Sequence, residues 1–144
     1  MLETLEQMIE RHEGYRTTPY IDSVGVQTIG IGHNLHKPLT RTAIVQILRD
    51  DIAEAKNDCI HAFPWFAELS QPRQWAMIDL CFNMGLTKLV GNGKDIPGFQ
   101  KFLKAMSLGN YEQAAVELQD SLWFKQVKSR GPEIVGMIRG STEV

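Results

Sequence analysis

Apolar residues recur at helical spacing at the start of the chain. One stripe over residues 2–13 is formed by Leu2, Leu5, Met8, Ile9 and His12. This spacing predicts a short amphipathic helix. Gly14 follows it and is suited to end the helix, because glycine tolerates the left-handed conformation found there.

The pattern changes between Tyr15 and His36, where Tyr, Val, Ile, Thr and Gly dominate. Gly25 marks a turn, and two further glycines, Gly30 and Gly32, lie downstream. This composition predicts a small antiparallel sheet of two or three short strands. Glycines inside strands often mark a close approach of the backbone to a ligand.

Helical spacing returns from Thr40. Thr40 or Thr42 can cap a helix that runs to about Ala62, before Pro64. We expect its buried face to consist of Ile44, Ile47, Leu48, Ile52, Ala55 and Cys59.

A second strong helix is predicted to open at Ser70 and Pro72 and to end at Gly85. It is apolar on nearly all sides, so we expect it to be central. Residues 86–97 are rich in Gly, Asn and Pro and are predicted to form a loop. Three shorter helices are expected at about 98–108, 111–120 and 130–138.

These elements together predict an α+β fold in a single domain of 144 residues. A small sheet lobe would cover about 14–39, and a connecting helix would cover 40–62. Residues 1–13 and 63–144 would form a mostly helical lobe. Such a layout favours an active-site cleft between the two lobes.

The composition is that of an ordinary globular domain, with 43% hydrophobic and 22% charged residues. The net charge of −2 argues against nucleic acid as a partner. Cys59 and Cys81 lie in apolar helical patterns, where cysteine is usually a small buried hydrophobe. Their spacing is not that of a metal site, and it neither demands nor excludes a disulfide.

No apolar run approaches the length of a membrane-spanning helix. The N-terminal segment is acidic and lacks the basic start and apolar stretch of a secretion signal. We therefore expect no stable membrane insertion, and a protein that is made and held in the cytoplasm.

Three residues in the first 28 positions could carry chemistry. Glu13 lies at a predicted helix end, where the partial negative charge favours a protonated carboxyl group. Asp22 lies in a predicted turn and Thr28 in a predicted strand. Each residue alone is ordinary in such a place. Together they suit glycoside hydrolysis, which needs one carboxylic acid and a second carboxylate in a different environment.

The same region carries a resemblance to a known family. The segments EGYR from Glu13, YIDSVG from Tyr20 and TIGIGH from Thr28 resemble the signature of the phage-type (T-even-like) lysozymes, glycoside hydrolase family 24. Residue type and spacing agree along the whole motif. Downstream, WAMIDLCFNMG from Trp75 and YEQAAVEL from Tyr111 are similar to later helices of that family.

The resemblance implies a lysozyme-like fold and a role for each motif residue. Glu13 would be the general acid. Asp22 would act with Thr28 to activate a water on the opposite face of the sugar, with inversion at the anomeric carbon. That outcome requires carboxyl groups roughly 6.5–9.5 Å apart. Arg130 would pair with Glu13.

The expected substrate-binding residues are Gly32, Phe82, Asn83 and Arg130. Phe82 suits an apolar wall of the site and core packing equally well. His33 could be a catalytic base, but the resemblance favours a structural histidine. Four positions depart from the best-known member of the family. Asn34, Phe102 and Glu117 replace residue types that contact sugar in that member, and Leu122 stands where it has an arginine.

The resemblance implies a monomeric phage endolysin, a muramidase that cuts peptidoglycan glycan strands for host lysis, with no metal or organic cofactor. It would stay in the host cytoplasm until a separate holin-type protein releases it. A lytic transglycosylase would need the acid but not the activated water. A non-catalytic peptidoglycan-binding module would need neither.

Overall fold

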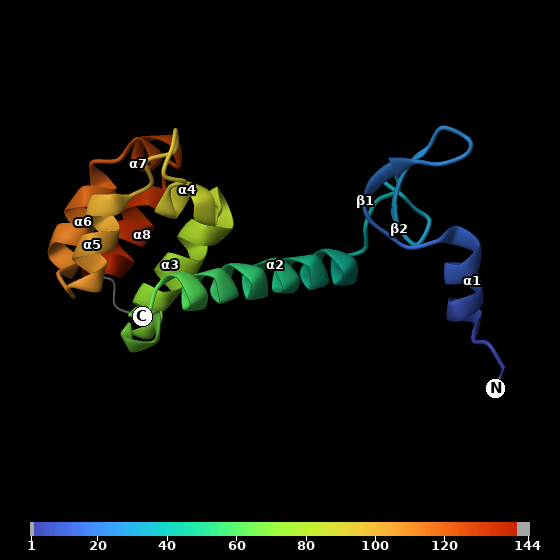
Figure 1. Cartoon of the computed structure of the whole chain (residues 1–144), viewed down its shortest axis with the longest axis horizontal. Coiled ribbons are helices and arrows are strands. Elements are labelled where there is room, and N and C mark those ends of the chain that lie inside the picture. The colour runs from blue at the N-terminus through green and yellow to red at the C-terminus, as the bar shows by residue number, and fades with distance from the viewer. Residues whose placement is uncertain (1, 141–144) are drawn as a thin grey trace. The chain divides into compact units, whose positions relative to one another are not determined.

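The computed structural model describes residues 2–140. The chain forms two compact units, Met1–Val45 and Gln46–Val144. Within the described residues there are eight α-helices, one 3-10 helix and a three-stranded sheet (Figure 1). The predicted α+β class is therefore confirmed, whereas the predicted boundaries of the lobes stay predictions.

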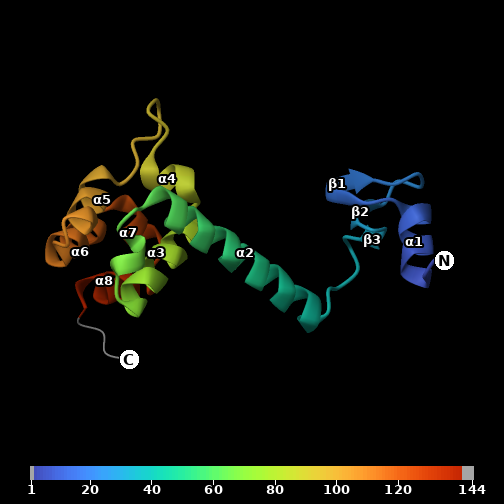
Figure 2. The same cartoon turned by 60° about the horizontal axis from the view of Figure 1, so that its bottom comes forward.

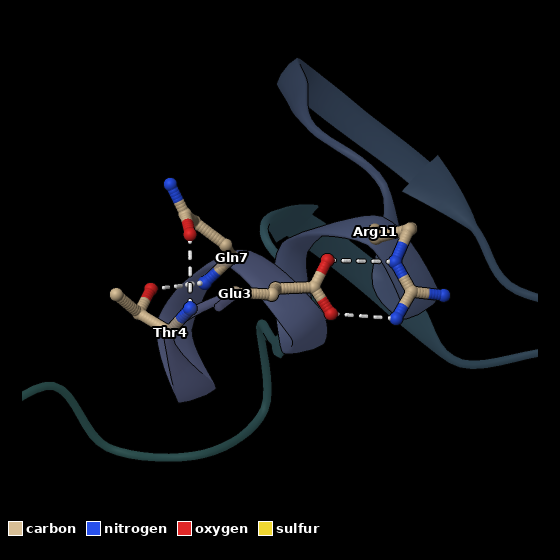
Figure 3. Close-up of polar contacts among 4 residues, drawn as sticks. All are labelled: Glu3, Thr4, Gln7 and Arg11. Atoms are coloured by element: carbon tan, nitrogen blue, oxygen red, sulfur yellow. Dashed lines mark hydrogen bonds and ion pairs between the residues drawn. The ribbon is translucent and has the colours of Figure 1, made fainter. Parts of the chain in front are cut away.

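The first unit opens with α1 (Leu5–Glu13), which ends as predicted but starts three residues later than the predicted helix over 2–13. The helix begins at Leu5 because Thr4 caps it. The Thr4 hydroxyl accepts from the backbone of Gln7 at 3.1 Å, and the Gln7 side chain accepts from the backbone of Thr4 at 2.9 Å (Figure 3). The Arg11 guanidinium also donates two hydrogen bonds to the Glu3 carboxylate, at 2.7 and 2.9 Å (Figure 3). These local bonds hold both ends of a helix that buries no side chain.

The sheet follows at once and has the strand order β1-β2-β3, as Figure 2 shows. Its strands are β1 (Arg16–Ile21), β2 (Gln27–Gly30) and β3 (His33–Asn34). All neighbours are antiparallel, and Thr28 pairs with Tyr20 on one side and with Asn34 on the other. The predicted small sheet is confirmed, and Thr28 lies at its centre.

The long helix α2 (Arg41–Ala62) begins where the capping pattern predicts. The Thr40 hydroxyl accepts from the backbone of Ala43 at 3.2 Å, so Thr40 is the capping residue. The prediction of its buried face was partly wrong. Only Ala55 and Cys59 are buried, while the four residues earlier on that face are 41–52% exposed. The reason is that the helical period defines a face, whereas the neighbouring elements decide how much of it is covered.

The second unit holds the hydrophobic core. Its central helices are α3 (Gln71–Met84), α5 (Gln100–Ser107), α6 (Tyr111–Gln119) and α8 (Arg130–Arg139). Helix α6 packs against both α5 and α8, and α3 packs against α8 (Figure 1). Two of its shorter elements are η1 (Phe66–Glu68) and α7 (Leu122–Gln126). The helix predicted to be central, now α3, supplies four buried residues: Ala76, Met77, Leu80 and Cys81.

One prediction in this unit was wrong. The first part of the predicted loop 86–97 is a helix, α4 (Leu86–Val90). Its five residues are too few to show a helical period, but Leu89 is fully buried and anchors the segment. The rest is a loop in which Gly91 and Gly98 touch backbone to backbone. A Cβ on Gly98 would lie 2.5 Å from the Gly91 nitrogen, so only glycine fits there.

The two thiols meet in the core, from α2 and α3. Cys59 and Cys81 are both buried and free, and their sulfurs lie 3.5 Å apart. The hydrogen bond to Cys81, together with burial, raises the pKa of the Cys59 thiol. The thiolate is the form that reacts. Cys59 is therefore protected from thiol reagents by its burial and because its sulfur stays protonated.

Because both thiols are buried, we expect neither of them to react with a thiol-specific disulfide reagent at pH 8 in the folded protein. Both should react within seconds once the protein is unfolded in guanidinium. The released chromophore would be measured with and without denaturant. Stoichiometric labelling of the native protein would contradict the burial of this pair.

Candidate active site

Glu13 is the last residue of α1. Gly14 ends the helix there with φ +82°, and its N–H donates to the carbonyl of Glu10 at 2.7 Å. The helix thus ends at Glu13, and β1 begins two residues after Gly14. As a result, the Glu13 carboxyl group stands at the negative end of the helix, as the sequence predicts, and it is exposed.

Gly32 lies directly against this carboxyl group. A Cβ on Gly32 would be 2.7 Å from Glu13 Oε2 and 2.9 Å from its carboxyl carbon. The backbone also has φ +69°, which disfavours other residues. The structure thereby brings together two of the predicted site residues, one from α1 and one from the turn between β2 and β3.

Asp22 closes the turn between β1 and β2. Its Oδ1 accepts from the backbone N–H groups of Val24 at 3.0 Å and Val26 at 2.8 Å. Its own N–H donates to the Val26 carbonyl at 2.9 Å. One carboxylate oxygen is therefore used to hold the turn. The other, Oδ2, has no hydrogen-bond partner within residues 2–140.

Thr28 joins the same arrangement through Val26. The buried Thr28 hydroxyl donates to the Val26 carbonyl at 2.9 Å, so this oxygen accepts from both Asp22 and Thr28. Because the hydroxyl proton is engaged with the Val26 carbonyl, the Thr28 hydroxyl oxygen can only accept further hydrogen bonds. Val26, a residue with no predicted role, thus links Asp22 and Thr28.

The second unit holds the other predicted residues. Phe82 and Asn83 lie in the last turn of α3. Phe82 is 43% exposed, so it is not a core residue. Trp123 Nε1 donates to Asn83 Oδ1 at 2.9 Å. Because an indole nitrogen can only donate, this bond fixes which end of the Asn83 amide is the oxygen. The Asn83 amide nitrogen is thereby left as a donor.

Arg130 begins α8 and pairs with a residue that the sequence analysis missed. Its Nε lies 3.3 Å from Asp79 Oδ1. Burial raises the pKa of Asp79 above its usual value, Arg130 opposes this effect, and Glu133 adds to it. The expected pairing of Arg130 with Glu13 stays a prediction.

Asp79 and Arg130 line a groove of about 480 Å³ in the second unit. Its apolar walls come from α2 and α3 and include Ile52, Trp75 and Phe82. One signal of this ion pair was present in the sequence. Asp79 is the only charged residue between Trp75 and Met84, and a lone carboxylate in an apolar helix needs a partner.

The positions that depart from the family pattern have separate places in the fold. Phe102 is 1% exposed and belongs to the core, so it has no surface to offer a sugar. The Asn34 side chain accepts from the backbone of His36 at 2.9 Å and holds a turn. Glu117 accepts from Gln113 at 2.9 Å within α6, and Leu122 is exposed on α7.

Two further properties bear on the kind of site. Among residues 2–140, no three His, Cys, Asp or Glu side chains are grouped so that they could hold a metal ion. Across the same residues, no helix combines the length and apolar character that crossing a bilayer requires.

A sequence model of the family "Phage lysozyme" matches residues 10–141, which is most of the chain. The chain belongs to the phage lysozyme family. The match includes Glu13, Asp22 and Thr28 and runs through α8. The predicted family is thus confirmed.

Several curated proteins are similar to this chain. "Probable T4-type lysozyme 2" and "Probable T4-type lysozyme 1" of Dictyostelium discoideum are each 23% identical, over 99% of this chain and 97% of their own length. The "Pre-baseplate central spike protein Gp5" of Enterobacteria phage T4 is 26% identical, over 94% of this chain. The match spans only 27% of that spike protein.

This membership makes the chain a glycoside hydrolase of the lysozyme type. The family match covers both units, and it agrees with the α+β fold described above.

Proposed function

We propose that this lysozyme is a muramidase that hydrolyses the β-1,4 bond from N-acetylmuramic acid to N-acetylglucosamine in bacterial peptidoglycan. The observation that carries the proposal is the hairpin geometry, in which Val26 joins Asp22 and Thr28, close in sequence to a helix-end Glu13. Glycoside hydrolysis needs these two carboxyl groups in different environments.

In the proposed mechanism, Glu13 donates its proton to the glycosidic oxygen as the bond to the anomeric carbon breaks. A water attacks that carbon from the opposite face and transfers a proton to Asp22. The Oδ2 atom of Asp22 and the hydroxyl oxygen of Thr28 suit this role, because each is left as a hydrogen-bond acceptor. The product has inverted configuration, and no metal or organic cofactor takes part.

We further propose that Gly32, Phe82, Asn83 and Arg130 bind the glycan strand. Gly32 keeps the backbone next to Glu13 free of a side chain. Phe82 offers an exposed apolar ring, and Asn83 offers a fixed amide donor. Arg130 offers a partly exposed cation. Such a set of one apolar face and few polar groups is typical of sugar recognition.

Product analysis on purified peptidoglycan tests the reaction. We expect muropeptides with new reducing ends at muramic acid, and the α-anomer as the first product in proton NMR. Anhydro-muramic products would instead establish a lytic transglycosylase. Binding to peptidoglycan without products would establish a non-catalytic binding module.

For its biological role, we propose an endolysin that acts as a monomer, waits in the host cytoplasm and depends on a holin-type protein for release. Expression in a bacterium should then cause lysis only when a membrane-permeabilising protein is expressed with it.

One observation favours a second candidate. A baseplate spike protein contains a segment similar to this chain, so the chain could serve as the lysozyme unit of a larger assembly. Association with purified phage particles would support that role.

The contact between Gly32 and Glu13 leads to a paired prediction. The Gly32→Ala change should lower the free energy of unfolding by about 1–2 kcal/mol, because the backbone there is left-handed. It should also lower kcat by about 100-fold, because the new methyl group displaces the Glu13 carboxyl group. Urea unfolding and turnover of peptidoglycan would measure the two effects.

The matched control is Gly30→Ala. Gly30 has nearly the same φ of +70°, but a Cβ there would meet nothing within 4 Å. We expect a similar loss of stability with little loss of kcat. Equal loss of activity in both variants would contradict a specific role of Gly32 beside Glu13.

A further inference from the structure

The second unit buries a pair of thiols that the proposed reaction does not use. Cys59 lies in the last turn of α2 and is fully buried, and Cys81 lies in the last turn of α3 and is 5% exposed. Both belong to the unit Gln46–Val144, and they are the two cysteines of the sequence. One buried cysteine is commonly a small hydrophobe, but two that meet from different helices have the chemistry of a crosslink.

The two sulfurs are hydrogen-bonded to each other. Cys59 Sγ donates to Cys81 Sγ at 3.5 Å, across 22 positions of the sequence. A disulfide has a sulfur–sulfur distance of about 2.05 Å, so closure moves the two atoms together by roughly 1.5 Å. The folded unit has therefore already brought together the ends of a long loop, a step that costs an unfolded chain conformational entropy.

The pair divides the roles that thiol–disulfide exchange needs. The hydrogen bond from Cys59 lowers the pKa of Cys81, against the effects of burial and of the charge of Asp58. The same bond raises the pKa of Cys59. Cys81 also has the less buried side chain of the two. It is therefore the attacking sulfur, and Cys59 is the resolving thiol.

We propose that Cys59 and Cys81 form an internal disulfide in an oxidising environment, so that the protein has a dithiol form and a more stable, crosslinked form. The oxidant is a low-molecular-weight disulfide. The Cys81 thiolate attacks one sulfur of this disulfide, whose S–S bond breaks and releases one thiolate. Cys59 then loses its proton and attacks the Cys81 sulfur, which releases the second thiolate. Each released thiolate takes up a proton, and two electrons pass from the protein to the oxidant.

Burial decides when this exchange takes place. Both thiols are enclosed in the folded dithiol form, so oxidation occurs while the chain folds or when the core of the second unit opens. Neither thiol is among the residues proposed to bind or cleave the glycan. The crosslink is therefore independent of the reaction performed at the active site.

Refolding in mixtures of reduced and oxidised glutathione tests the proposal. The reduced chain is equilibrated in each mixture, once without denaturant and once in guanidinium. Exchange is then stopped with acid, free thiols are alkylated, and the disulfide fraction is read from the intact mass. We expect the equilibrium constant for the internal disulfide to be about 100-fold larger in the folded protein than in the denatured chain, because a crosslink that stabilises the fold is stabilised by the fold to the same extent.

Thermal unfolding gives a second readout of the same linkage. The crosslinked form should melt about 5–10 °C above the dithiol form, and dithiothreitol should abolish the difference. Equal equilibrium constants with and without guanidinium, or a crosslinked form that melts below the dithiol form, would overturn the proposal. So would glutathione adducts or linked dimers in place of the internal disulfide.

Cys59→Ala and Cys81→Ala are the matched controls, since each removes one sulfur and keeps the other. Each variant should melt at the same temperature in oxidising and reducing buffer, whatever its own stability, because no internal disulfide can form. A melting temperature that rises in oxidising buffer as much in either variant as in the parent would also count against the crosslink and overturn the proposal.

Discussion

Replacement of Glu13 by glutamine should lower kcat on purified peptidoglycan by about 10²–10⁴-fold, the usual contribution of a general acid. Glutamine has the same size but no acidic proton to give to the leaving oxygen. Glu13 is an exposed residue at the end of α1, a helix that buries no side chain, so its replacement by a residue of equal size removes no core packing. We therefore expect an unchanged melting temperature and unchanged binding to peptidoglycan.

Glu10→Gln is the matched control for this variant. Glu10 lies one turn earlier on the same helix and is also exposed. Its replacement should leave kcat within a factor of two. Turnover would be followed by the release of reducing ends, and binding by sedimentation with insoluble peptidoglycan. A Glu13→Gln protein that keeps a tenth or more of the parent kcat would rule out Glu13 as the acid.

The second large effect concerns stability rather than chemistry. The Phe102→Ala change should lower the free energy of unfolding by about 3–5 kcal/mol, because it empties a fully enclosed position in the core. A natural domain has only about 5–15 kcal/mol in total, so the variant should be close to unfolded at 37 °C. Urea denaturation followed by circular dichroism would measure the change.

Phe82→Ala provides the comparison within the same unit. Its ring is 43% exposed, so we expect a loss below about 1 kcal/mol and an effect mainly on KM. The family resemblance of the sequence implies that Phe102 stands where another member contacts sugar. If Phe102→Ala raised KM while it left stability unchanged, the burial of that ring would be contradicted.

The sequence predicted most elements of this fold, because the information for them is local. The capping residue Thr40 bonds to a backbone N–H three residues away, so its effect is visible in a short window. The turn at Asp22 depends likewise on bonds that span two to four residues. The motif from Glu13 to His33 therefore carried the family signal and the candidate carboxyl groups with their spacing.

Burial and long-range pairing were less accessible, because they depend on what the rest of the chain brings close. The helical period identified the apolar face of α2, but only Ala55 and Cys59 of that face are buried. The segment Leu86–Val90 has too few residues to show a period, and it is a helix because Leu89 fills the core.

What the sequence by itself determined is therefore the family, the α+β class and the candidate residues Glu13, Asp22 and Thr28, since all of these rest on local spacing. Only the tertiary structure decided that Asp79 pairs with Arg130, 51 positions later in the chain, and that Phe102 lies inside the core. Those two outcomes depend on how α3, α5, α6 and α8 pack together, and packing between distant segments is set by shape and volume that no short stretch of sequence contains.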